Sequence, residues 1–137
     1  MCGNIAYGFS HRIKIRKNSV LKGRGRLGGN MKGKIFKIEF YVPETHLEKV
    51  KTAIFADGAG KIGNYDCCSW QTAGTGQFRP CEGSKPFIGE KDRIETVLEY
   101  KVEIVCDSKH INNVIEALKK YHPYETPAYQ YWEIKLQ

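Results

Sequence analysis

The 137-residue sequence lacks any apolar run that approaches the ~20 residues of a membrane-spanning helix. Its N-terminus also lacks the apolar stretch of about 7–15 residues that marks a secretory signal. With neither signal present, we expect a cytoplasmic protein with no membrane partner. Hydrophobic residues make up 41% of the chain and charged residues 27%, which is typical of one globular domain.

Acidic residues are absent from the first 33 positions, although eight basic residues occur there. Residues 34–137 therefore hold 14 basic and 15 acidic residues, and the net charge of +7 belongs to the N-terminal segment. A basic segment by itself is weak evidence for nucleic-acid binding. Nucleic acid is thus a disfavoured partner, and deletion of residues 1–30 would test it.

Residues 1–33 contain seven of the 14 glycines and no amphipathic helix, so we expect a poorly structured basic leader. Residues 28–31 read Gly-Gly-Asn-Met, which a purine-rich ribosome-binding sequence followed by a start codon can encode. The hypothesis is therefore that Met31 is the natural start and that the leader is not native. The alternative is a native arm in which Ile13 and Ile15 form an edge strand.

Catalytic signatures are also missing. The five cysteines include no CxxC pair, and their odd number in a chain without an export signal predicts free thiols. Cys67 and Cys68 are adjacent, so within a strand they would point to opposite faces. No GxxxxGK[ST] loop, Ser/His/Asp order or Cys/His pair stands out. We therefore predict no catalytic residue, no cofactor and no metal site, and we favour a non-enzymatic role.

Hydrophobic periodicity predicts a first strand–helix–strand unit. Residues 34–42 alternate as a strand, and Leu47, Val50 and Ile54 recur at helical spacing after Pro43. Glycines at positions 58 and 60 are expected to end this helix. Residues 65–72 are predicted to form the second strand, and a turn at 73–76 would reverse it into residues 77–79.

A second unit of the same kind follows a loop at residues 80–91. Alternation predicts a long strand through residues 98–106, and residues 128–136 are predicted to form the last strand. Asp107 or Ser108 is the expected N-cap of the helix between them, and Pro123 is the expected stop. The apolar stripe of this helix comprises Ile111, Val114, Ile115 and Leu118.

Two such units with right-handed crossovers predict a ferredoxin-like α+β domain (βαβ-βαβ) over residues 34–137. It would have a four-stranded antiparallel sheet with two helices on one face, plus a hairpin and loop excursion. The other sheet face would stay open. An open face with aromatic side chains tends to be covered by a partner subunit, so we expect a homo-oligomer.

Four segments carry a family resemblance: residues 60–70, 74–80, 83–89 and 122–129, the last reading His-Pro-Tyr-Glu-Thr-Pro-Ala-Tyr. Together they resemble the YqfO-type insert domain of the Nif-three family, the GTP cyclohydrolase I type 2 homologues, here as a stand-alone protein. The resemblance implies a fold similar to the trimeric, sensor-like PII and CutA proteins. It therefore favours a trimer over a dimer.

The resemblance does not carry an enzymatic activity with it. In the larger family proteins, a separate core supplies paired histidines for a two-metal site, whereas this chain has four histidines and no His-His pair. A metal-dependent hydrolase acting on a nucleotide therefore remains an alternative that only the family name suggests.

The candidate binding site joins the long connection at residues 63–89 to the Pro-bounded segment at 122–127. The six candidate ligand-binding residues are Asn64, Tyr65, Trp70, Arg79, His122 and Glu125. The aromatic residues with Arg79 could stack a planar ligand, although a subunit interface or the core would explain them too. His122 and Glu125 are too few to close a metal site, and both could instead be structural.

These observations predict a small oligomeric binding, sensor-like or assembly module. Its partner would be a small ligand or a protein, and the identity of that ligand stays open. Glycine-rich turns in the same region could form an anion-binding nest, or they could simply supply positive φ angles.

Overall fold

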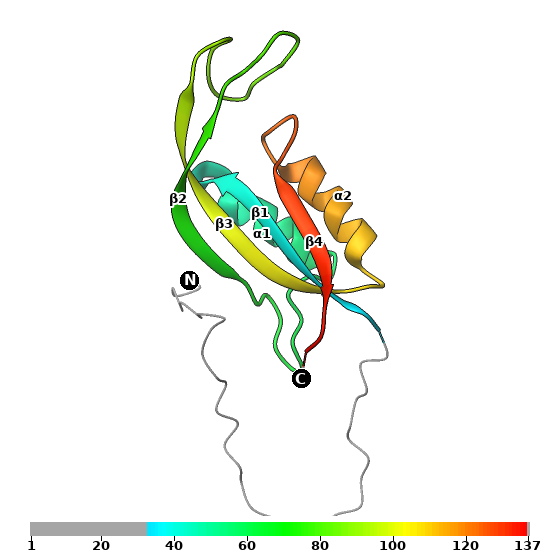
Figure 1. The fold of residues 1–137 in the computed structure, drawn as a ribbon. Helices are drawn as coiled ribbons and strands as arrows, with labels where there is room; N and C mark the ends of the chain where they lie inside the picture. The colour runs from blue at the N-terminus through cyan, green and yellow to red at the C-terminus, as the bar shows by residue number, and fades with distance from the viewer. Residues whose placement is uncertain (1–32, 137) are drawn as a thin grey trace, which may run out of the picture.

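The computed structural model describes residues 33–136. Its elements are β1 (Ile35–Pro43), the 3₁₀ helix η1 (Glu44–His46), α1 (Leu47–Ala56), β2 (Trp70–Phe78), β3 (Glu95–Asp107), α2 (Ile111–Tyr121) and β4 (Tyr129–Ile134). The four strands form one antiparallel sheet in the order β2-β3-β1-β4. Figure 1 shows the sheet with its two helices. The predicted ferredoxin-like fold is confirmed, while the predictions for the leader up to residue 32 lie outside the described residues.

The core lies between the sheet and the two helices. On β1, Ile38, Phe40 and Val42 are all fully buried, as the alternation predicted. Ile38 is paired with Ile104 and Phe40 with Val102 in the β1–β3 register. The helices close this layer with Val50, Ile54, Val114 and Leu118, each of which is also fully buried. The helical stripes predicted from the sequence therefore face the sheet.

The end of α1 agrees with the prediction, whereas the start of α2 does not. Gly58 and Gly60 have φ angles of 100° and 75°, so the chain leaves α1 through conformations that favour glycine. The predicted N-cap of α2 is wrong, because His110 occupies that position without a side-chain cap. Asp107 acts one turn earlier, where its carboxylate accepts the Lys109 N–H at 2.9 Å.

The predicted turn at residues 73–76 is also wrong. β2 runs unbroken from Trp70 to Phe78, paired with residues 103 to 95 of β3. The reversal comes later, in the connection at 79–94, and Figure 1 shows the hairpin projecting beyond the helices. Gly76 lies inside the strand, and the Glu99 carboxylate occupies the space that a Cβ at this position would take. A glycine that the sequence pattern assigned to a turn thus makes room for a side chain.

The uncovered face of the sheet is polar at its centre. Glu39 is only 8% exposed there, and its carboxylate accepts Lys101 Nζ at 2.7 Å, Tyr41 Oη at 3.2 Å and Gln130 Nε2 at 2.5 Å. Burial opposes ionisation of Glu39, but these three donors outweigh it and lower the pKa of the carboxyl group. Lys37 and Glu103 form a second ion pair beside it.

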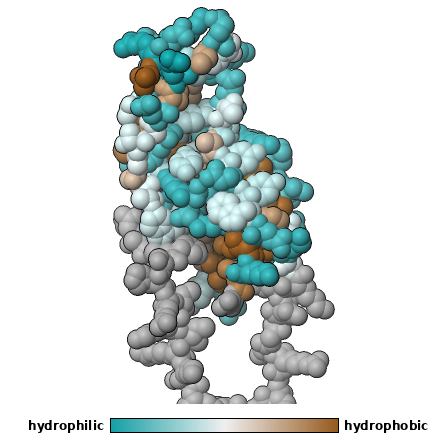
Figure 2. Space-filling view, in the orientation of Figure 1, coloured by the Kyte–Doolittle hydropathy of each residue, from teal (hydrophilic) through white to brown (hydrophobic). Residues whose placement is uncertain are grey.

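Aromatic residues are divided between the two faces. The register places Trp70 opposite Glu103 and Trp132 opposite Lys37, which puts both indoles on the uncovered face. Tyr129 is paired with Phe40 instead and packs against the core. In Figure 2 the hairpin tip is mostly hydrophilic, and apolar side chains gather near the opposite end of the molecule.

Candidate functional site

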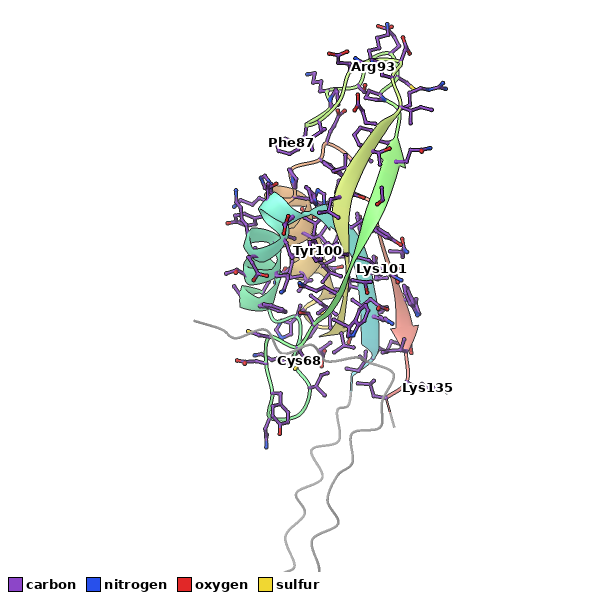
Figure 3. The ribbon with its side chains drawn as sticks, turned by 90° about the vertical axis from the view of Figure 1, so that its left-hand side faces the viewer. Cys68, Phe87, Arg93, Tyr100, Lys101 and Lys135 are labelled. Atoms are coloured by element: carbon purple, nitrogen blue, oxygen red, sulfur yellow. The ribbon has the colours of Figure 1, made fainter. Side chains whose placement is uncertain are left out.

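The six candidate residues fall at the two ends of β2. Asn64, Tyr65 and Trp70 lie before or at the start of the strand, whereas Arg79 follows its last residue. A nine-residue strand spans roughly 26 Å between its first and last residues. In Figure 3, Phe87 is labelled toward the hairpin end of the molecule, and Cys68 lies well below it, toward the other end. Within one chain, the six residues therefore do not form a single rim.

The end that holds Asn64 and Tyr65 is a tight turn. Ile62 and Tyr65 exchange two backbone hydrogen bonds of 2.9 and 3.0 Å. Tyr65 is 75% exposed to solvent. Cys67 lies in this loop with a φ of 52°, so the expectation for a strand does not apply to the cysteine pair. Partial burial raises the pKa of the neighbouring Cys68 thiol. The turn therefore presents an exposed aromatic ring.

The other end carries an open groove of about 440 Å³, which we call the distal groove. One wall comes from residues 76–88 of the hairpin, and the other comes from residues 124–128 between α2 and β4. Tyr41 and Glu99 of the sheet also line it. The lining residues used below are Phe78, Arg79, Phe87, Glu99, Tyr124 and Glu125.

Contacts between the two walls of the groove hold them in place relative to each other. The Glu125 carboxylate accepts the backbone N–H of Lys85 at 2.8 Å, a contact that joins residues 40 positions apart. The ring centroid of Tyr124 lies 6.2 Å from that of Phe78 and 6.3 Å from that of Phe87. The predicted neighbourhood of the hairpin connection and the segment at 122–127 is therefore present.

His122 fixes the second wall from behind. Its side chain is buried, its Nε2 lies 2.7 Å from the carbonyl oxygen of Tyr41, and its Nδ1 accepts the Tyr124 N–H at 3.1 Å. Because the carbonyl can only accept, Nε2 carries the proton and the imidazole is neutral. Burial lowers the pKa of His122, although the bond to Tyr41 opposes this effect. Both ring nitrogens are engaged, so His122 holds the backbone of the wall.

Glu99 and Tyr124 form the polar centre of the groove. The Tyr124 hydroxyl donates to the Glu99 carboxylate at 2.7 Å. Burial, and then this bond, raise the pKa of Tyr124, so the phenol stays protonated at neutral pH. Sequence reasoning missed Glu99 because only the strand register reveals that it shares a face with Tyr41 and Gly76. The only indication in the sequence was the alternation of the strand, which places residue 99 on the face opposite to its apolar neighbours 98 and 100.

Among residues 33–136, no three His, Cys, Asp or Glu side chains come together in a group able to hold a metal ion. Cys67, Cys68, Cys81 and Cys106 are free thiols. No helix in this described part is long and apolar enough to cross a membrane.

Architecture and groove together define a ferredoxin-like α+β domain with an extended β2–β3 hairpin. CutA from Archaeoglobus fulgidus shares this fold, with a TM-score of 0.54 at 16% identity over 75% of this chain and 86% of CutA. That likeness concerns the fold alone.

Sequence relatives identify the family more closely, although no family model matches the chain. The GTP cyclohydrolase 1 type 2 homolog of Halalkalibacterium halodurans is 42% identical over 100 residues, which cover 73% of this chain and 27% of the relative. The Mycobacterium tuberculosis homolog is 45% identical over 89 residues, covering 65% of this chain and 24% of that protein. The structure of a Bacillus cereus protein related to NIF3 matches with a TM-score of 0.66 at 35% identity, over 76% of this chain and 26% of that one.

The chain is therefore a homologue of the Nif-three family proteins over this domain, as the resemblance predicted. It spans about a quarter of the length of the curated relatives that it matches. The activity of those whole proteins is a separate matter from the chemistry of this domain.

Proposed function

We propose that this domain is a non-enzymatic, homo-oligomeric binding module whose distal groove takes a small ligand. The observation that carries the proposal is the groove itself, about 440 Å³ with aromatic walls and a few polar groups. Ligand sites in proteins share this volume range and this mixture of apolar walls and convergent polar groups.

Preorganisation supports binding at this place. The Lys85–Glu125 hydrogen bond and the ring contacts of Tyr124 hold the two walls together. A site that is already ordered loses less conformational entropy when a ligand enters. The hairpin connection thus forms one wall of the groove, with Phe87 as its aromatic residue.

A thermal-shift screen of small metabolites tests this role. A ligand at about 100 times its Kd stabilises the native state by about 2.7 kcal/mol, which corresponds to a rise in Tm of roughly 10–20 °C for a domain of this size. We expect such ligands to stabilise the wild type and Glu116→Ala, a change on the exposed side of α2 outside the groove, but not Phe87→Ala. Hits that stabilise both variants equally would place binding elsewhere and contradict the proposal.

Assembly is the second part of the proposal. Trp132 on the uncovered face is 41% exposed, and Ile94 and Leu98 on the hairpin are 64% and 53% exposed. Exposed apolar side chains of this kind are typical of subunit interfaces. A neighbouring copy could also bring its Asn64, Tyr65 and Trp70 toward the groove, which would unite the six candidate residues.

Light scattering measures this assembly directly. At tens of micromolar protein we expect a mass near three protomers of 15.6 kDa, with a dimer as the second choice. A monomer at that concentration would rule out the oligomer. The same preparation distinguishes the hydrolase alternative, because metal analysis and a nucleotide hydrolysis assay would reveal a stoichiometric metal ion with turnover.

A further inference from the structure

The distal groove combines aromatic rings with the carboxylate of Glu99, which accepts a single hydrogen bond from the described residues. Phe78 and Phe87 both approach the Tyr124 ring at tilted angles of 53° and 47°, so the three rings do not stack face to face. Glu99 lies beside them, and its Oε1 accepts the Tyr124 hydroxyl. Among residues 33–136, no hydrogen bond or ion pair engages its second oxygen, Oε2, which lies over Gly76.

The charge of the groove has a definite sign. Its lining includes two carboxylates, Glu99 and Glu125, and one cation, Arg79. Each carboxylate accepts one hydrogen bond, Glu125 from the Lys85 N–H and Glu99 from the Tyr124 hydroxyl, but Glu125 is exposed whereas Glu99 is half-buried beside the rings. The groove therefore carries a net charge of −1, and the more buried of its carboxylates lies next to the aromatic rings.

We propose that the distal groove binds an organic ammonium cation, with the cationic head beside Glu99 and against the rings of Phe78, Phe87 and Tyr124. Aromatic faces attract cations, and clusters of such rings are the usual receptors of alkylated ammonium groups. The adjacent carboxylate adds a charge interaction that a neutral ligand cannot use. This inference rests on the proposed function, because it names the ligand class of the same groove.

Other ligand classes fit the groove less well. An anion would meet Arg79 but also two carboxylates. A bare metal ion would find only the carboxylates Glu99 and Glu125, and no group of three metal-ligating side chains exists in the described part of the chain. A neutral apolar molecule could contact the rings, yet it would leave the Glu99 carboxylate partly desolvated without compensation.

A matched pair of probes tests the proposal on the full chain. Choline and 3,3-dimethyl-1-butanol have the same shape, but only choline carries the charge. We expect choline to shift the amide NMR signals of residues 78–87 and 124–128, with an affinity at least about tenfold above that of the alcohol. Glu99→Gln keeps an acceptor for the Tyr124 hydroxyl, and it should weaken choline binding about tenfold without changing the alcohol. Arg93→Gln at the hairpin tip is the control and should change neither.

The alternative outcomes separate this inference from the proposed function. Equal affinities for choline and the alcohol, or choline binding that Glu99→Gln does not weaken, would overturn the assignment of a cation. If an anionic or neutral ligand shifts the groove signals and choline does not, the cation inference fails while the groove stands as a binding site. If no ligand shifts these signals, both fail.

Discussion

Replacing Leu118 with alanine is expected to lower the free energy of unfolding by about 2–5 kcal/mol. Leu118 is fully buried where α2 meets the sheet, in the cluster that contains Ile38, Phe40 and Ile104. Removing three carbon atoms there loses transfer free energy and leaves a cavity that the rigid sheet cannot fill. Denaturant unfolding at a fixed protomer concentration measures the loss, since oligomer formation makes stability depend on concentration.

The matched control for Leu118 is Glu116→Ala on the exposed side of the same helix. Its partner Lys119 is 3.8 Å away at the surface, so the change should stay within about 0.5 kcal/mol. If both variants lost the same stability, α2 would not pack on the sheet through Leu118, and the core assigned here would be wrong.

The second large effect is expected for His122→Ala, which should lower the free energy of unfolding by about 2–4 kcal/mol. The imidazole connects the Tyr41 carbonyl to the Tyr124 N–H, and alanine would leave both partly buried backbone groups without this partner. Arg79→Ala on the exposed rim should change stability by no more than about 0.5 kcal/mol. A neutral effect of His122→Ala in chemical denaturation would mean that the imidazole does not hold the groove wall.

The pH dependence of stability gives His122 a separate signature. Burial holds its pKa below the usual value, so the unfolded chain takes up this proton at higher pH than the folded domain does. The contribution of His122 is complete above about pH 6.5, the ordinary histidine pKa, and is lost as the pH falls from there toward the folded pKa. His122→Gln should flatten this part of the profile, and an unchanged slope would contradict a neutral buried imidazole.

Much of the fold follows from side-chain periodicity. The alternation around Ile38 and Phe40 and the stripe from Ile111 to Leu118 each point to one buried face, and the structure buries both. Positive φ angles at Gly58 and Gly60 likewise match the predicted end of α1. Local patterns succeeded where one physical requirement, burial or backbone conformation, determined the residue type.

Prediction failed where the surroundings of a residue come from a part of the chain that is distant in sequence. Gly76 appeared to be a turn residue, but it lies within β2, beside the Glu99 carboxylate of the next strand. Asn64 and Arg79 were grouped because both lie in the segment 63–89, which was predicted to be one long connection, whereas the unbroken strand β2 separates them. Tyr41 and Glu99 were missed since only the register between strands brings them to the groove.

Mapping a stabilising ligand onto the protein by amide NMR tests the central claim most directly. The account predicts that the largest signal changes fall on residues 78–87 and 124–128, the two walls of the distal groove. Residues 62–68 at the opposite end of β2 provide the internal control, and changes there should appear only if a neighbouring subunit completes the site. Largest changes on the uncovered sheet face, with the groove signals unmoved, would contradict the claim that the groove is the binding site.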